Sequence, residues 1–349
     1  MTSLTPGKAW GLRRLADDTG RFMMLAVDQR PPIKQLVANA RGETDSRPGD
    51  VAAVKRILVE ELGPYATAVL LDPHHAYPAA INAVSPRSGL LLTLEDSVFE
   101  ETQRGRLSDS IDDWSVDKIR RIGGDAVKVL AWYRPDADPG VSERQKDYVA
   151  SIGEQCRRYD IPFLFELLVY SFPGDDGHTT DYIEQASKHS DHVIESVETF
   201  ADPRYGIDVF KLESPLPAAL VPDPLIGDPA EVERTSELFN ALGSASPVPW
   251  VMLSAGATKE AFTRILEYAY KAGASGFLAG RAIWWDELQA FPDVPECRRA
   301  LADTSVAYME TIRTLTTDMA QPYAGFPASD SLEQSLDSGF RSTYGSILP

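Results

Sequence analysis

The sequence of 349 residues predicts a single-domain (β/α)8 TIM barrel followed by a C-terminal extension. Eight short apolar runs alternate with longer amphipathic stretches, a pattern typical of strands and helices around a parallel sheet. No Gly-x-Gly-x-x-Gly or phosphate-loop motif follows a predicted strand, so a doubly wound open sheet is the less favoured alternative. We expect the barrel to occupy residues 1–320 and a tail rich in Ser, Gly and Pro to occupy residues 321–349.

The predicted elements follow from these patterns in chain order. The eight strands are Phe22–Val27, Ala68–Asp72, Gly89–Thr93, Ala126–Ala131, Phe163–Leu168, Asp208–Glu213, Trp250–Ser254 and Gly276–Gly280. The helices between them are Val51–Leu62, Ser115–Ile122, Glu143–Arg158, Ile183–Phe200, Pro229–Leu242 and Lys259–Ala272. The polar segment Asn39–Asp50 is predicted to be a loop, and Tyr170–Glu184 is a candidate lid.

Composition limits the classes of function. The net charge of -18 argues against nonspecific binding to nucleic acid and to anionic membranes, and an anionic substrate would need a local cationic site. The two cysteines exclude a disulfide scaffold and fit a reducing cytosol. Without an apolar stretch of transmembrane length or a signal-peptide core, the sequence predicts a soluble cytoplasmic protein. It leaves open whether the chain forms a homo-oligomer.

Three charged residues interrupt three successive apolar runs. They are Lys128, Glu166 and Lys211, in the predicted fourth, fifth and sixth strands. Because Lys and Glu are rarely buried without partners, their repeated presence in buried strands suggests that they meet in a functional pocket. Two lysines and a carboxylate suit imine chemistry on a carbonyl: one amine attacks, a neighbouring cation helps to keep it neutral, and the carboxyl moves protons.

Polar residues also end three other predicted strands, at the barrel rim where such folds carry their active sites. The first strand ends in Asp28, Gln29 and Arg30. The last two strand ends resemble a phosphate site built from backbone amides, with Arg281 as a bidentate anion donor. This second group comprises Ser254, Gly256, Gly280 and Arg281. A phosphorylated carbonyl compound is therefore the expected ligand.

The chain resembles the class I tagatose-bisphosphate aldolases and the related sulfofructose-phosphate aldolases. The resemblance is carried by ordered blocks from about residue 25 to residue 282. These blocks are AVDQR (26–30), AVLLDP (68–73), GRL (105–107) with WS (114–115), AVKVL (126–130), IPF (161–163) with Glu166, DVFKLE (208–213), LSAG (253–256) and GASGFLAGRA (273–282).

This resemblance implies a role for each candidate residue. Lys211 matches the Schiff-base lysine, Lys128 the second lysine, and Glu166 the carboxylate that transfers protons. Asp28, Gln29 and Arg30 match the group that meets the sugar hydroxyls and the distal end of the substrate. Ser254, Gly256, Gly280 and Arg281 match the site for the phosphate on the ketone half. The family cleaves ketohexose bisphosphates to dihydroxyacetone phosphate and glyceraldehyde 3-phosphate without a cofactor or a metal.

Several alternatives stay open from the sequence. Lys211 could pair with Glu213, which shares its strand face, and Lys128 could pair with Glu166. His74 and His75 after the second strand would serve a metal-dependent isomerase or epimerase, although three converging ligands would be needed. A noncatalytic metabolite sensor would keep the same pocket. Tagatose 1,6-bisphosphate is the leading expected substrate and 6-deoxy-6-sulfofructose 1-phosphate is the rival; the stereochemistry of the sugar is open.

Overall fold

The computed structural model describes residues 4–175, 178–180 and 188–323. Its main sheet is a closed barrel of eight parallel strands in the order β1-β10-β9-β8-β7-β6-β3-β2. The strands are β1 (Phe22–Ala26), β2 (Ala68–Leu71), β3 (Gly89–Thr93), β6 (Ala126–Trp132), β7 (Phe163–Leu168), β8 (Val209–Leu212), β9 (Trp250–Met252) and β10 (Gly276–Ala279). The predicted TIM barrel and all eight predicted strands are confirmed; β3 and β7 have the predicted bounds, and the other strands differ by one or two residues at one or both ends.

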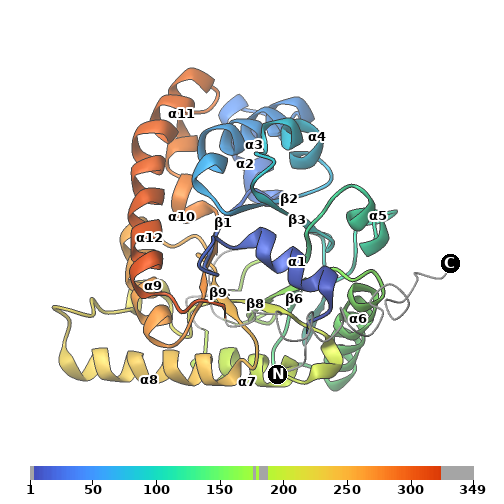
Figure 1. Ribbon diagram of the computed structural model, residues 1–349, viewed down its shortest axis with the longest axis vertical. Coiled ribbons are helices and arrows are strands. Elements are labelled where there is room, and N and C mark those ends of the chain that lie inside the picture. Colours follow the sequence, from blue (N-terminus) through green and yellow to red (C-terminus); the bar gives the residue numbers. More distant parts are fainter. Residues whose placement is uncertain (1–3, 176–177, 181–187, 324–349) are drawn as a thin grey trace, which may run out of the picture.

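Helices surround the barrel, as Figure 1 shows. Their bounds are α1 (Pro6–Leu15), α2 (Pro31–Arg41), α3 (Pro48–Leu62), α4 (Ala76–Ala80), α5 (Val116–Arg121), α6 (Pro139–Arg158), α7 (Ser190–Phe200), α8 (Pro229–Ala245), α9 (Lys259–Lys271), α10 (Arg281–Trp284), α11 (Val294–Ala300) and α12 (Val306–Met319). Within the described residues, none of these helices is long and apolar enough to cross a membrane.

Local chemistry explains where several helices begin. Asp228 precedes Pro229, and its carboxylate accepts backbone hydrogen bonds from the first turn of α8. Thr258 caps α9 through its side-chain hydroxyl. The apolar residues that recur at helical spacing along α9 are buried: Phe262, Ile265, Leu266 and Ala269. The Asp138 carboxylate likewise caps α6, which explains why α6 begins four residues before the predicted Glu143.

Some predictions were wrong in extent. Asn39–Asp50 is not wholly a loop, because α2 continues to Arg41 and α3 begins at Pro48. Helix α7 begins at Ser190, and residues 183–187 of its predicted start lie outside the described residues. A hairpin of β4 (Glu100–Thr102) and β5 (Gly105–Leu107) was not predicted. Parts of the candidate lid, 176–177 and 181–184, and of the tail, 324–349, also lie outside the description. The domain boundary near residue 320 stays a prediction.

The N-terminal helix closes one end of the barrel. Leu12 and Leu15 of α1 join the cluster of apolar side chains inside the barrel, and α1 crosses the centre of the ring of helices in Figure 1. Lys8 of α1 forms a buried ion pair with Asp208, which precedes β8, at 2.7 Å. This closure leaves the other end of the barrel, where the strands have their carboxyl termini, for the polar residues.

Candidate active site

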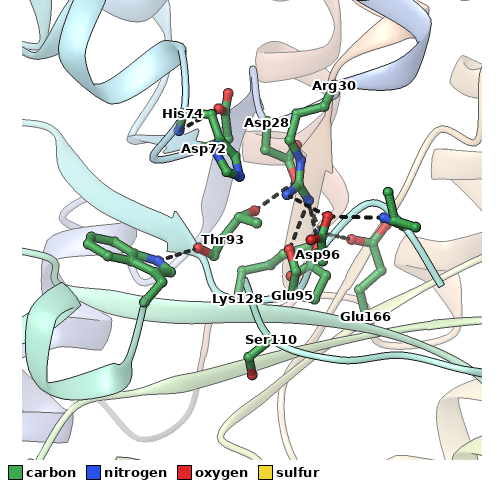
Figure 2. Close-up of polar contacts among 12 residues, drawn as sticks. Asp28, Arg30, Asp72, His74, Thr93, Glu95, Asp96, Ser110, Lys128 and Glu166 are labelled. Carbon is green, nitrogen blue, oxygen red and sulfur yellow. Dashed lines mark hydrogen bonds and ion pairs between the residues drawn. The ribbon is translucent and has the colours of Figure 1, made fainter. Parts of the chain in front are cut away.

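Lys128 on β6 is the centre of a buried ionic cluster at the carboxyl ends of the strands. Its Nζ lies 2.6 Å from Glu95 Oε1, 2.8 Å from Glu166 Oε2 and 3.1 Å from Asp28 Oδ2. Figure 2 shows these carboxylates converging on Lys128 from separate segments of the chain. Thr93 at the end of β3 donates a further hydrogen bond to Asp28 at 3.1 Å. Each of the four charged residues is less than a tenth exposed.

Glu166 bridges the two lysines that the sequence singled out. Its Oε1 lies 2.8 Å from Nζ of Lys211, and its Oε2 lies 2.8 Å from Nζ of Lys128. Parallel pairing between β7 and β8 places Glu166 directly beside Lys211. The predicted ion pair between Lys128 and Glu166 is therefore present. One oxygen of Glu166 therefore contacts each lysine.

Glu213 does not pair with Lys211, the partner considered from the sequence, but with other groups. One of its oxygens accepts the Val169 backbone N–H at 2.7 Å, and the other lies 3.2 Å from Nζ of Lys188. Lys188 precedes α7, and its side chain is fully buried. Glu213 therefore ties the ends of β7 and β8 to the segment before α7, and Lys211 pairs with Glu166.

The cluster changes the proton affinity of its members. Burial alone would lower the pKa of Lys128, but Asp28, Glu166 and Glu95 outweigh burial and raise it well above the usual range. Burial would raise the pKa of Asp28 and of Glu166, but the lysines overcome burial and lower both values. Lys128 is thus a lasting cation, as expected beside Lys211, but three carboxylates surround its charge.

Glu95 differs from the other two carboxylates. Burial raises its pKa, and the opposing charges of Lys128 and Arg30 only partly compensate. Glu95 is not among the residues predicted from the sequence, although it ends an apolar stretch in the same way as Asp28 does. The buried stretch continues past the end of β3 at Thr93 through Leu94 to Glu95.

A second group of residues lies where the sequence predicts an anion site. Ser254 follows β9, and the next two residues, Ala255 and Gly256, have positive φ values of 46° and 84°. This left-handed turn lets the backbone pass close to Arg281, since a Cβ placed on Gly256 would lie 3.6 Å from the guanidinium carbon. Gly280 is the N-cap residue that precedes α10, and a Cβ placed on Gly280 would lie 2.7 Å from the Ala26 carbonyl oxygen.

Both groups open onto one pocket. Its lining includes nine of the ten predicted site residues: Asp28, Gln29, Arg30, Lys128, Glu166, Lys211, Ser254, Gly280 and Arg281. The tenth, Gly256, lies behind the Arg281 guanidinium. Arg30 is buried and donates to the Glu95 carbonyl at 2.9 Å, while its Nε and Nη1 make no hydrogen bond within the described residues. The pocket is thus lined by two arginines, Arg30 and Arg281, as well as by the lysine pair.

The histidines considered from the sequence do not line this pocket. The backbone N–H groups of His74 and His75 donate to Asp72, which pairs with Lys55 beneath the rim. No group of three or more His, Cys, Asp and Glu side chains that could hold a metal ion occurs in the described parts of the chain. Trp284 is fully buried and donates to the Ala26 carbonyl at 3.2 Å.

Comparisons with known proteins agree with this architecture. The family model of the DeoC/LacD family aldolases matches residues 22–286. A tagatose 1,6-diphosphate aldolase of Listeria monocytogenes is 37% identical over 83% of this chain and 85% of its own length. A tagatose 1,6-diphosphate aldolase 1 of Streptococcus mutans is 31% identical over 88% of this chain and 99% of its own.

Solved structures share the fold at lower identity. A fructose-bisphosphate aldolase from Plasmodium falciparum superposes with a TM-score of 0.61 at 13% identity, covering 92% of this chain and 98% of its own. An archaeal fructose-1,6-bisphosphate aldolase, solved with its catalytic Lys covalently bound to the carbinolamine intermediate, gives a TM-score of 0.54 at 17% identity, over 88% of this chain and 98% of its own. The chain is an aldolase and belongs to the DeoC/LacD family.

Proposed function

We propose that the protein is a class I aldolase that cleaves tagatose 1,6-bisphosphate to dihydroxyacetone phosphate and glyceraldehyde 3-phosphate in the cytoplasm. The observation that carries this proposal is the buried arrangement in which Glu166 joins Lys211 to Lys128. The names of the curated relatives supply the substrate, and both cysteines are buried free thiols, as suits a reducing compartment.

Lys211 is the proposed imine-forming residue. Its amine loses a proton to Glu166, 2.8 Å away, and then attacks the ketone carbon of the substrate. Glu166 next donates a proton to the hydroxyl of the carbinolamine, which leaves as water and gives a protonated imine. The bond between the α- and β-carbons of the imine then breaks as the hydroxyl on the β-carbon loses its proton to a base. The electron pair of that bond forms the enamine double bond, and the C=N pair moves to the nitrogen of Lys211. Water and Glu166 reverse the first steps after the enamine has been protonated at carbon.

Lys128 keeps Glu166 ionised and aimed at Lys211. Because its own pKa is raised, it remains charged while Glu166 gains and loses a proton. Lys128 also holds Asp28 at 3.1 Å, at the edge of the pocket where the sugar hydroxyls would lie. Removing its charge should therefore disturb both proton transfer and substrate orientation.

The ketone-side phosphate is proposed to bind between the turn after β9 and Arg281. Backbone N–H groups in a left-handed turn form a concave anion site, and the Arg281 guanidinium adds charge-assisted hydrogen bonds. Such a fixed site would hold the reacting ketone at Lys211. The rest of the substrate would extend toward Asp28, Gln29 and Arg30.

A sulfonate at the distal end is the second candidate. Arg30 lies 3.9 Å from Glu95 and 4.0 Å from Asp96, so nearby carboxylates offset much of its charge. That environment suits a monoanionic sulfonate better than a doubly charged phosphate. In this reading the substrate is 6-deoxy-6-sulfofructose 1-phosphate, and the chemistry at Lys211 is unchanged.

Steady-state cleavage of the two ketoses separates these candidates. We expect tagatose 1,6-bisphosphate to give the higher kcat/KM, measured by coupled detection of dihydroxyacetone phosphate, with and without a chelator. A preference for the sulfosugar would change the assigned substrate and keep the mechanism. Loss of activity on chelation would contradict the lysine mechanism and favour a metal-dependent reaction. Binding of both ketoses without turnover would favour a metabolite sensor.

A further inference from the structure

We propose that Glu95 is an additional catalytic residue, whose Oε2 accepts the proton of the substrate hydroxyl when the carbon–carbon bond breaks. This inference rests on the proposed aldolase function and deepens it. Glu95 would then take the hydroxyl proton, and Glu166 would serve imine formation at Lys211. Glu95 differs from Asp28 and Glu166 in the partners of its oxygens and in its proton affinity.

Oxygen occupancy separates Glu95 from Glu166. Each oxygen of Glu166 lies 2.8 Å from the Nζ of a lysine, although its Oε2 accepts no hydrogen bond from the described residues. Glu95 contacts Lys128 through Oε1 alone, at 2.6 Å. Its Oε2 is buried and forms neither a hydrogen bond nor an ion pair with the described residues, although Glu95 lines the pocket. A buried carboxylate oxygen without a partner is costly to maintain, so a hydroxyl of the substrate is a reasonable partner for it.

The surroundings of Glu95 hold it firmly. Arg30 donates to its backbone carbonyl at 2.9 Å, and the backbone N–H of Leu94, the preceding residue, donates to the Lys128 carbonyl at 3.0 Å. Glu95 also forms an antiparallel bridge with Ser110. A group held on both sides can keep its free oxygen at a fixed place in the pocket, as a general base must.

The charges and the burial around Glu95 make it a better base than Asp28 or Glu166. Lys128 and Arg30 favour its ionised form, while Asp28 and burial oppose it, and the net effect is a raised pKa. Asp28 and Glu166 have lowered pKa values and so hold protons weakly. Asp96, next in sequence, lies 4.0 Å from Arg30 and is more exposed. General bases work best when their pKa lies near the working pH, which favours the carboxylate whose pKa is raised.

Proton removal by Glu95 accompanies cleavage of the carbon–carbon bond. Ionised Glu95 removes the proton from the hydroxyl on the carbon that becomes the aldehyde. The electron pair of that O–H bond forms the C=O bond, and the pair of the breaking carbon–carbon bond moves to the protonated imine on Lys211. The products are the aldehyde, a neutral enamine on Lys211 and a protonated Glu95. In the reverse direction, protonated Glu95 donates to the aldehyde oxygen as the new bond forms.

The test is the substitution Glu95→Gln, which keeps the side-chain shape and removes the base. Its matched control is Glu100→Gln on the β4–β5 hairpin, where the side chain is 62% exposed. Two reactions are compared: trapping of dihydroxyacetone phosphate on Lys211 with borohydride, which needs only the ketone half, and cleavage of tagatose 1,6-bisphosphate. We expect Glu95→Gln to be trapped as the wild type is and its kcat for cleavage to fall about 10²–10⁴-fold.

The pH dependence of kcat distinguishes a catalytic role of Glu95 from a structural one. Wild-type kcat should rise with pH as Glu95 loses its proton, and this limb should disappear in Glu95→Gln. If Glu95→Gln is poorly folded by circular dichroism, Glu95→Ala with added formate provides a second test, since formate can replace the lost carboxylate. We expect formate to restore cleavage in that variant.

Three results would overturn the assignment. Cleavage at the wild-type rate in Glu95→Gln would show that another group takes the proton. Equal loss of trapping and of cleavage, without rescue by formate, would reduce Glu95 to a positioning residue for Lys128. If the wild type itself gives no adduct on Lys211, the proposed function fails and the role of Glu95 fails with it. The first two results leave the wild-type adduct in place, so the two failures are distinguishable.

Discussion

Replacing Lys128 by Met tests the ionic cluster on which the proposed site depends. Met has a similar length and no charge, so the change leaves Asp28, Glu95 and Glu166 buried without their shared cation. At an effective dielectric constant of about 20, a charge pair 2.8 Å apart attracts by about 6 kcal/mol before desolvation is counted. Desolvation offsets much of this, and breaking a buried ion pair typically costs about 3–5 kcal/mol. We therefore expect Lys128→Met to lose about 3–5 kcal/mol of unfolding free energy near neutral pH.

The loss should depend on pH in a defined direction. In the wild type, Asp28 and Glu166 have lowered pKa values, so they add stability above their unfolded-state values of about 4, and this stability is lost as the pH falls through the folded-state values. Without Lys128, burial would raise these pKa values and the ionised carboxylates would oppose folding. The deficit of the variant should therefore be largest near pH 7 and shrink toward about pH 4.

Urea unfolding of both proteins at about pH 7 and about pH 4.5 measures this deficit. The double variant Lys128→Met with Glu95→Gln should recover part of the loss at neutral pH, because one of the uncompensated charges is gone. A variant as stable as the wild type at pH 7, or a deficit that grows on acidification, would refute the electrostatic reasoning.

Three further predictions concern the pocket and are measured by steady-state kinetics. Glu166→Gln should lower kcat about 10²–10⁴-fold by removing the proton carrier of imine formation, and an unchanged kcat would exclude that role. Arg281→Ala should raise KM about 10–100-fold, because hydrogen bonds to charged groups contribute about 1.5–3 kcal/mol; an equal effect on a substrate without the ketone-side phosphate would count against the anion site. Gly280→Ala should destabilise the protein by about 1–3 kcal/mol and weaken substrate binding, because its Cβ would lie 2.7 Å from both the Ala26 carbonyl oxygen and the Gln29 side chain; an unchanged KM would contradict this close packing.

The barrel could be predicted because its strands are buried on both faces. Such strands appear as continuous apolar runs, and a lysine or glutamate within one stands out. Lys128, Glu166 and Lys211 were found in this way, and their meeting followed from the order of neighbouring strands. The contacts within the cluster could not be predicted, because Asp28 and Lys128 are 100 residues apart and meet only when the barrel closes.

Other features depend on tertiary packing that leaves little trace in the sequence. The strands of the β4–β5 hairpin are three residues long, and its buried Arg106 lies over the rings of Phe99 and Trp132. No apolar alternation reveals such a hairpin. Helix α2 was missed for a different reason, since Ile33, Leu36 and Val37 do have helical spacing and are buried in the core. The predicted loop Asn39–Asp50 overlaps only the end of α2, and no element is predicted for the residues before it.

Borohydride trapping with dihydroxyacetone phosphate tests the central claim most directly. The wild-type protein and Lys211→Met are treated in parallel, and the modified peptide is located by mass spectrometry. Imine catalysis predicts a stable adduct on Lys211 that is absent from the variant. Folded wild-type protein that binds dihydroxyacetone phosphate but forms no adduct on any lysine would contradict the class I mechanism.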